Sequence, residues 1–171
     1  MSEKSTRDDA ETFDVVVTRV LGTPVEEAWK AWSDPAYVTR WWGPTGFTSP
    51  SAEMDFRVGG ASLVCMRAPA EYGGQDMYHT WTYTTIESHE RIGFVSNFAD
   101  KDGTHLDPAA LGMPPGVPHD VPHEITFAPG PARLLTLHTP AAGFGPFLRA
   151  MAEGHEEPQA LARSGFDQSP S

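Results

Sequence analysis

From Phe47 onward, apolar and polar residues alternate with a period of two, which is the pattern of half-buried β-strands. The alternation predicts strands over residues 47–58, 61–67, 77–87 and 91–98, with turns between them. Two further strands are expected over residues 123–127 and 132–139. Because short connections suffice to join these strands, we expect an antiparallel meander.

A β-branched run over residues 13–20 predicts one more strand before this region. Two short helices are expected after it. Thr23 is placed at the first N-cap, with Pro24 in the first helical position and Glu26 closing a capping box. Asp34 and Pro35 repeat this start, and Gly43-Pro44 ends the second helix.

Five prolines between residues 103 and 122 exclude a regular helix or a central strand there, so we expect a long ordered loop. Residues 147–163 are rich in Ala, Leu, Met and Glu and predict a C-terminal helix, which Pro158 should kink. The order of elements indicates an α+β domain over residues 13–166. Residues 1–12 and 167–171 are expected to be tails, the first of them disordered.

Composition narrows the choice of partners. The formal charge of −11 and only three lysines leave no basic stripe for nucleic acid or an anionic membrane. The N-terminus has no apolar signal core, and no apolar run is long enough to span a bilayer. A single cysteine, Cys65, fits a reducing compartment. We therefore expect a soluble, cytoplasmic protein.

On the predicted strand 77–87, alternation places His79 on one face with Trp81 and Tyr83. A polar group among aromatic rings can orient a ligand, although a lone buried histidine more often makes a structural hydrogen bond. His79 is therefore the strongest polar candidate for a binding site. If the protein is an enzyme, His79, Tyr83 and His155 are the candidates for general acid or base.

Four tryptophans lie within fourteen residues on the two predicted short helices. Trp29 and Trp32 are interpreted mainly as core, whereas Trp41 and Trp42 are equally open to core and ligand-wall interpretations, since adjacent residues cannot both face inward. All four could instead form one wall of a pocket.

Other polar patterns favour ordinary structural explanations. His119 and His123 stand four apart, but Pro118 and Pro122 prevent the helix that would bring them onto one metal. Glu53, Asp55 and Arg57 alternate along a predicted strand and indicate a solvated face, opposite Met54, Phe56 and Val58. Since no phosphate loop or metal-ligand cluster is visible, no cofactor is expected.

Several motifs together resemble a known family. They are AWSDPAYVTRWWGPTGF at residues 31–47, EMDFRVGG at 53–60, ESHERI at 87–92, FADKDG at 98–103 and DPAALGMPPGVP at 107–118. In this order, they resemble the activator of heat-shock-protein-90 ATPase-like family, within the START/SRPBCC or helix-grip superfamily. The resemblance covers about residues 13–157 and is nearest to a bacterial, single-domain branch.

The resemblance implies a helix-grip fold: a curved antiparallel sheet of about six to seven strands wrapped around a C-terminal helix, with two short helices after the first strand. It also implies an apolar cavity between the sheet and that helix. The segment GHEEPQALARSGF departs from the family pattern, since Pro158 weakens the helix where it should close the cavity.

The leading functional hypothesis is a binder of a small hydrophobic or amphipathic molecule. The alternatives are a chaperone-associated interaction module and a cyclase or condensation enzyme using the same cavity. Besides the ligand, a chaperone and a second copy of the chain are candidate partners. The residues expected to line the cavity are Trp41, Met54, Phe56, Cys65, His79, Trp81, Tyr83, Phe94, Phe98, Phe127, Leu135, Leu137 and Met151.

Overall fold

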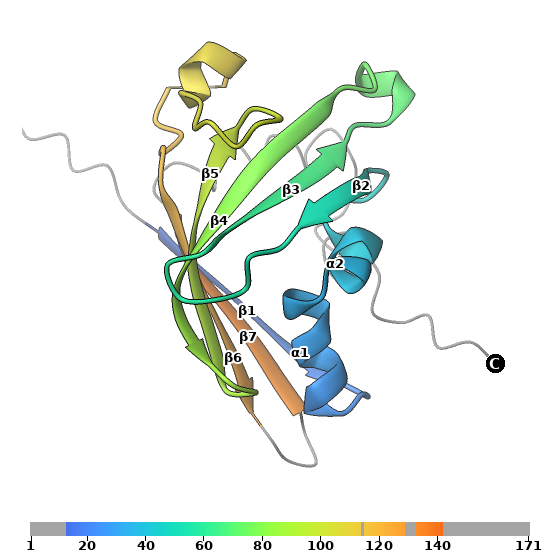
Figure 1. The fold of residues 1–171 in the computed structure, drawn as a ribbon, viewed down its shortest axis with the longest axis vertical. Coiled ribbons are helices and arrows are strands. Elements are labelled where there is room, and N and C mark those ends of the chain that lie inside the picture. The colour runs from blue at the N-terminus through green and yellow to red at the C-terminus, as the bar shows by residue number, and fades with distance from the viewer. Residues whose placement is uncertain (1–12, 114, 129–132, 142–171) are drawn as a thin grey trace, which may run out of the picture.

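A computed structural model describes residues 13–113, 115–128 and 133–141. Within these residues, an antiparallel sheet has the strand order β1-β7-β6-β5-β4-β3-β2 (Figure 1). This confirms the α+β class. The predicted C-terminal helix, 147–163, and both predicted tails lie outside the described residues. The strands are β1 (Phe13–Leu21), β2 (Thr48–Glu53), β3 (Ala61–Arg67), β4 (Asp76–Glu87), β5 (Arg91–Ala99), β6 (Val121–Ala128) and β7 (Arg133–Ala141).

The two predicted short helices follow the first strand, and both lie on the same side of the curved sheet (Figure 1). They are α1 (Val25–Ser33) and α2 (Pro35–Trp41). Helix α1 buries Ala28, Trp29, Ala31 and Trp32, which recur at helical spacing along one stripe. The apolar stripe that defines this helix in the sequence therefore faces the core.

Of the two predicted helix caps, one is confirmed. The Asp34 side chain caps α2, since its Oδ1 accepts a hydrogen bond from the Ala36 N–H at 2.8 Å. Thr23 is not the cap of α1, because Pro24 occupies that position and no side chain caps the helix there. The expected capping box between Thr23 and Glu26 is therefore wrong: the helix starts one residue later, and the Pro24 carbonyl accepts its first hydrogen bonds.

Register decides which side chains share a face of the sheet, because directly opposed residues point to the same side. His79 is opposite Val64 on β3 and Phe98 on β5, and the next inward row of β4 holds Trp81. We call the side that carries these residues and the two helices the inner face. Cys65 is opposite Tyr78, so it lies on the outer face and its predicted place in the cavity is wrong.

The first strand after the helices is shorter than predicted. Strand β2 ends at Glu53, and residues 54–60 turn instead of continuing it. Two short-range hydrogen bonds make this turn, from the Arg57 N–H to the Asp55 carbonyl and from the Gly60 N–H to the Arg57 carbonyl. Val58 is consequently 58% exposed, which corrects its expected place on the apolar face.

The described residues of the proline-rich region, 103–113 and 115–120, form neither a long helix nor a strand, as expected, and contain one short 3-10 helix, η2 (Pro108–Leu111). A second 3-10 turn, η1 (Ala70–Tyr72), joins β3 to β4. The long loop packs on the outer face, where His105 Nε2 lies 3.0 Å from the Thr80 hydroxyl. It ends in β6, which begins before Pro122. Pro122 lies opposite Val95 of β5, and the pairing of β6 with β7 starts at Glu124.

Candidate functional site

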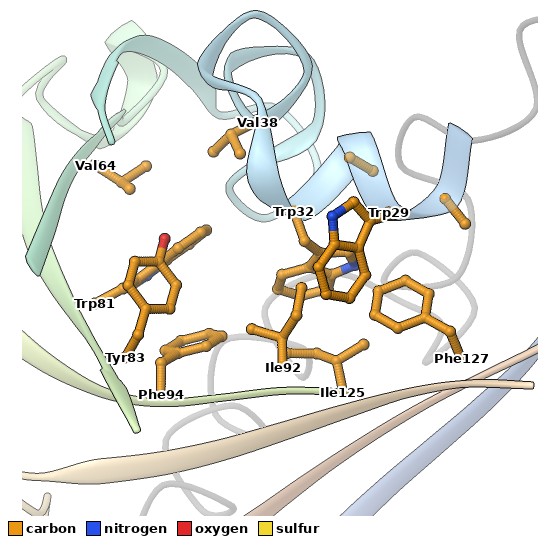
Figure 2. Close-up of a cluster of buried hydrophobic side chains, with 12 residues drawn as sticks. Trp29, Trp32, Val38, Val64, Trp81, Tyr83, Ile92, Phe94, Ile125 and Phe127 are labelled. Atoms are coloured by element: carbon orange, nitrogen blue, oxygen red, sulfur yellow. The ribbon is translucent and has the colours of Figure 1, made fainter. Parts of the chain in front are cut away.

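Aromatic rings form a continuous surface across the inner face. Trp29 and Trp32 descend on it from α1 (Figure 2). Trp29 contacts Phe127 with ring centroids 5.2 Å apart, and Trp81 stacks on Phe94 at 4.9 Å. Such contacts add stability beyond area burial, so this surface is the centre of the described core.

Three tryptophans and one histidine at one end of this surface form what we call the indole cluster: Trp32, Trp42, Trp81 and His79. The Trp42 ring meets Trp81 edge-on with centroids 4.7 Å apart, and lies 6.2 Å from the His79 ring. Trp32 lies 6.1 Å from Trp81. Helix α1, which carries Trp32, and the segment after α2, which carries Trp42, thus bring their side chains against the same stretch of β4.

Each member of the indole cluster has a buried nitrogen that lacks a hydrogen-bond partner among the described residues. The atoms are Nε1 of Trp32, Trp42 and Trp81, and Nδ1 of His79. Buried polar groups in native proteins are nearly always paired, and an unpaired one is costly. Trp41 provides the contrast, since its Nε1–H donates to the Ala31 carbonyl at 2.7 Å.

Burial keeps two histidines of the inner face uncharged. Desolvation lowers the pKa of His79 to about 4. The pKa of His123 is also lowered to about 4, by desolvation and then by repulsion from His79. His123 stacks on Phe94 with ring centroids 4.7 Å apart. At neutral pH both imidazoles are therefore neutral groups that can donate or accept one hydrogen bond at each nitrogen.

The hydroxyl group of Tyr83 is hydrogen-bonded within the protein. Its hydroxyl shares a 2.8 Å hydrogen bond with the Ser62 hydroxyl, and Ser62 Oγ also accepts from the Asp55 N–H at 3.1 Å. Desolvation raises the pKa of Tyr83 to about 12. The group therefore stays protonated at neutral pH and fixes the turn after β2 to the inner face.

The other predicted site residues fall into four sets. Phe94, Phe98 and Phe127 are buried on the inner face, whereas Met54, Phe56 and Trp41 are half-buried beside the core. Leu135 and Leu137 occupy register positions opposite Phe127 and Ile125. Met151 and His155 lie outside the described residues.

Trp42 and Ser62 are absent from the set predicted to line the cavity. The adjacent tryptophans leave open which of the two faces inward, and the structure brings Trp42 against Trp81 while Trp41 binds the α1 backbone. Ser62 is a small polar residue in a strand and gives no pattern of its own. Its role follows from register, which places it opposite Trp81.

The polar patterns expected to be structural have ordinary surroundings. Arg57 and Asp55 form an exposed ion pair with Nε and Oδ1 2.8 Å apart. His119 Nε2 lies 3.7 Å from Asp107 Oδ1 in the loop, away from the stacked His123. In the part of the chain that is described, no group of three His, Cys, Asp or Glu side chains could hold a metal ion.

A separate pocket of about 340 Å³ lies where the long loop meets the ends of β4 and β5. Its lining includes the apolar residues Met77, Phe98 and Leu106 and the carboxylates Asp76 and Asp100. Both carboxylates are engaged: Asp76 pairs with Arg67, and Asp100 accepts the N–H groups of its own turn. The pocket thus combines apolar side chains with two carboxylates that already have partners within the protein.

Comparison with solved structures shows the same fold in bacterial proteins. A protein from Chromobacterium violaceum is 26% identical, with a TM-score of 0.64 over 87% of this chain and 94% of that one. One from Mycobacterium smegmatis is 20% identical, with a TM-score of 0.63 over 85% and 82% of the two chains. An AHSA1-like protein from Aeromonas hydrophila is 20% identical, with a TM-score of 0.60 over 88% and 90%. No curated protein matches the chain.

None of the described helices is long and apolar enough to cross a membrane. Comparison with protein families matches residues 22–168 to the family described as activator of Hsp90 ATPase homolog 1-like protein. The match spans most of the chain and both short helices, and it agrees with the motifs of the first part of the sequence. The chain therefore belongs to the activator of Hsp90 ATPase homolog 1-like family.

Proposed function

We propose that the protein binds a small apolar or amphipathic molecule on the inner face of its sheet, between the sheet and the predicted C-terminal helix. The observation that carries this proposal is the aromatic surface on that face, which ends in a cluster of buried nitrogens without partners among the described residues. Ligand sites in proteins typically combine an apolar lining with a few converging polar groups.

The surface charge and the inner face support an uncharged, apolar ligand. The formal net charge is −11, and the described ion pairs of Lys30, Arg57 and Arg91 are exposed. The inner-face rows of β4 and β5 hold His79, Trp81, Phe94 and Phe98 instead. An apolar molecule placed there would bury its surface against rings, at about 25 cal/mol per Å².

Native mass spectrometry tests the proposal directly. The freshly purified protein is compared with its denatured mass, and then again after addition of fluorene, a rigid apolar probe. We expect a discrete mass increase in at least one of the two samples. Apo protein alone in both samples would contradict ligand binding.

A matched pair of variants locates the site. Trp42→Glu introduces a charge beside Trp81 and His79 and should abolish fluorene binding, because a buried carboxylate is costly to desolvate. Val58→Glu places the same charge on an exposed residue and should leave binding unchanged. Circular dichroism of both variants checks that the fold is retained. Equal binding by both would place the ligand elsewhere.

The enzymatic alternative finds less support. Tyr83 is protonated at neutral pH and bonded to Ser62, so it is poorly placed to accept a proton. His79 is neutral and could act as a base, but its buried Nδ1 has no hydrogen-bond partner among the described residues that would orient it for that role. A chaperone-associated role rests on the family description alone.

A further inference from the structure

We propose that the ligand is a neutral, planar and largely apolar molecule that carries a hydrogen-bond acceptor, a carbonyl or hydroxyl oxygen. The acceptor is held by the indole N–H groups of Trp42 and Trp81, beside His79. This inference rests on the proposed function and deepens it, because it assigns the chemical class of the ligand.

The donors are the first step. The Trp42 and Trp81 rings meet edge-on with centroids 4.7 Å apart, so two indole N–H groups come from one small region. Both Nε1 atoms are buried and have no hydrogen-bond partner among the described residues. An indole nitrogen can only donate, so the group that satisfies it must be an acceptor.

The third nitrogen lies next to this pair. The His79 side chain is 92% buried, since its exposed fraction is 8%, and its Nδ1 also lacks a partner among the described residues. Its ring meets Trp42 edge-on at 6.2 Å and Phe98 at 5.0 Å. A neutral imidazole nitrogen can donate or accept, so it can bind either a carbonyl or a hydroxyl group.

Trp41 shows that this fold can supply a hydrogen-bond acceptor for a tryptophan N–H within the protein itself. It is the residue next to Trp42, and its N–H donates to the Ala31 carbonyl at 2.7 Å. An N–H directed at an aromatic face gains only a weak hydrogen bond, so ring contacts within the indole cluster do not replace an acceptor. The difference between the neighbours points to a binding role for Trp42.

The ligand is neutral because the inner face offers no charge to pair with it. The inner-face rows of β3 to β6 include no lysine, arginine, aspartate or glutamate among the described residues. A charged group buried among these rings would lack a counter-ion and would be costly to desolvate. Planarity follows from the surroundings, since flat molecules pack best between rings.

The experiment compares two rigid molecules with the same ring skeleton, fluorene and fluorenone. Fluorenone adds one carbonyl acceptor. Binding is measured by isothermal titration calorimetry, and the indole N–H groups are followed by two-dimensional NMR. We expect fluorenone to bind about tenfold more tightly, the effect of one well-formed hydrogen bond. Two indole resonances should shift downfield with fluorenone and not with fluorene.

Two substitutions assign the donor. Trp42→Phe keeps an aromatic ring and removes one N–H, so it should reduce the preference for fluorenone over fluorene to about twofold. Trp29→Phe makes the same change at the far end of the aromatic surface, beside Phe127, and should keep the tenfold preference. Each variant is checked for its fold by circular dichroism.

The outcomes separate this inference from the proposed function. Equal affinity for the two molecules overturns the assigned ligand class but leaves apolar binding on the inner face standing. Loss of the preference in Trp29→Phe, with its retention in Trp42→Phe, also overturns the assignment. If neither molecule binds up to its solubility limit, the inference fails, and the proposed function fails with it when the freshly purified protein also shows only its apo mass.

Discussion

The buried polar groups of the outer face and the indole cluster of the inner face differ in whether their hydrogen bonds are satisfied within the described residues. On the outer face, Thr80 Oγ1 lies 3.0 Å from His105 Nε2, and the Asn97 amide donates to the His119 carbonyl at 2.8 Å and to the Asp120 carboxylate. On the inner face, the nitrogens of the indole cluster have no such partners among the described residues. Polar groups on the outer face therefore fasten the loop, whereas the four nitrogens of the indole cluster do not fasten any described segment.

The largest expected effect tests the outer face. Asn97→Leu removes both hydrogen bonds that tie the end of the loop to β5, one of them to a carboxylate. We expect the free energy of unfolding to fall by about 2–3 kcal/mol, measured by urea denaturation. Thr126→Leu, on an exposed residue of the same face, is the control and should change stability by less than about 0.5 kcal/mol. Equal losses would deny the loop contacts their stabilising role.

Burial of His79 on the inner face should make the free energy of unfolding depend on pH. His79 has a folded-state pKa of about 4, below its usual value, so the unfolded chain takes up a proton first as pH falls. The contribution of neutral His79 to the free energy of unfolding is complete above about pH 6.5 and is lost as the pH falls toward 4. Between pH 6.5 and pH 4, the free energy of unfolding of His79→Leu should therefore fall by less than that of the unmodified protein, and the difference should be on the order of 2 kcal/mol.

Urea denaturation from pH 7 to 4 measures this slope for both proteins. Identical slopes for the unmodified protein and His79→Leu would show that His79 titrates normally. NMR titration of the imidazole gives an independent value for its pKa.

The smallest effect compares two neighbouring tryptophans. Trp41→Phe breaks a hydrogen bond to the Ala31 carbonyl, whereas Trp42→Phe removes an N–H that has no described partner. Both changes lose similar ring area, so the difference in unfolding free energy isolates the hydrogen bond. We expect Trp41→Phe to be less stable than Trp42→Phe by about 1 kcal/mol in urea. The opposite order would mean that Trp42 is also structurally bonded.

Local sequence patterns determine most of the described elements. The period-two alternation gives β3 with its observed bounds and places His79 beside Trp81 and Tyr83, because successive side chains of a strand point to opposite faces. Asp34 followed by Pro35 starts α2, since a short acceptor side chain caps the first turn and proline has no N–H to satisfy there. These outcomes depend on neighbours in sequence alone.

The wrong placement of Cys65 has a physical cause: the sheet is buried on both faces at this point. Val64 and Cys65 are consecutive and both buried, so apolar character does not show which of them faces inward. Only pairing with β4, which sets Cys65 opposite Tyr78, decides it. Similarly, the turn after Glu53 depends on the Ser62 hydroxyl accepting from the Asp55 N–H, a contact that exists only once β3 is in place.

The candidate site divides in the same way. The sequence alone determines that aromatic residues are concentrated in the two short helices and in β4, and that His79 lies among them, because these facts follow from composition and alternation. The tertiary structure decides which indoles are satisfied. Trp41 reaches the backbone of α1 and Trp42 reaches His79 and Trp81, since hydrogen-bond partners are fixed by the packing of helices on the sheet and not by the order of residues.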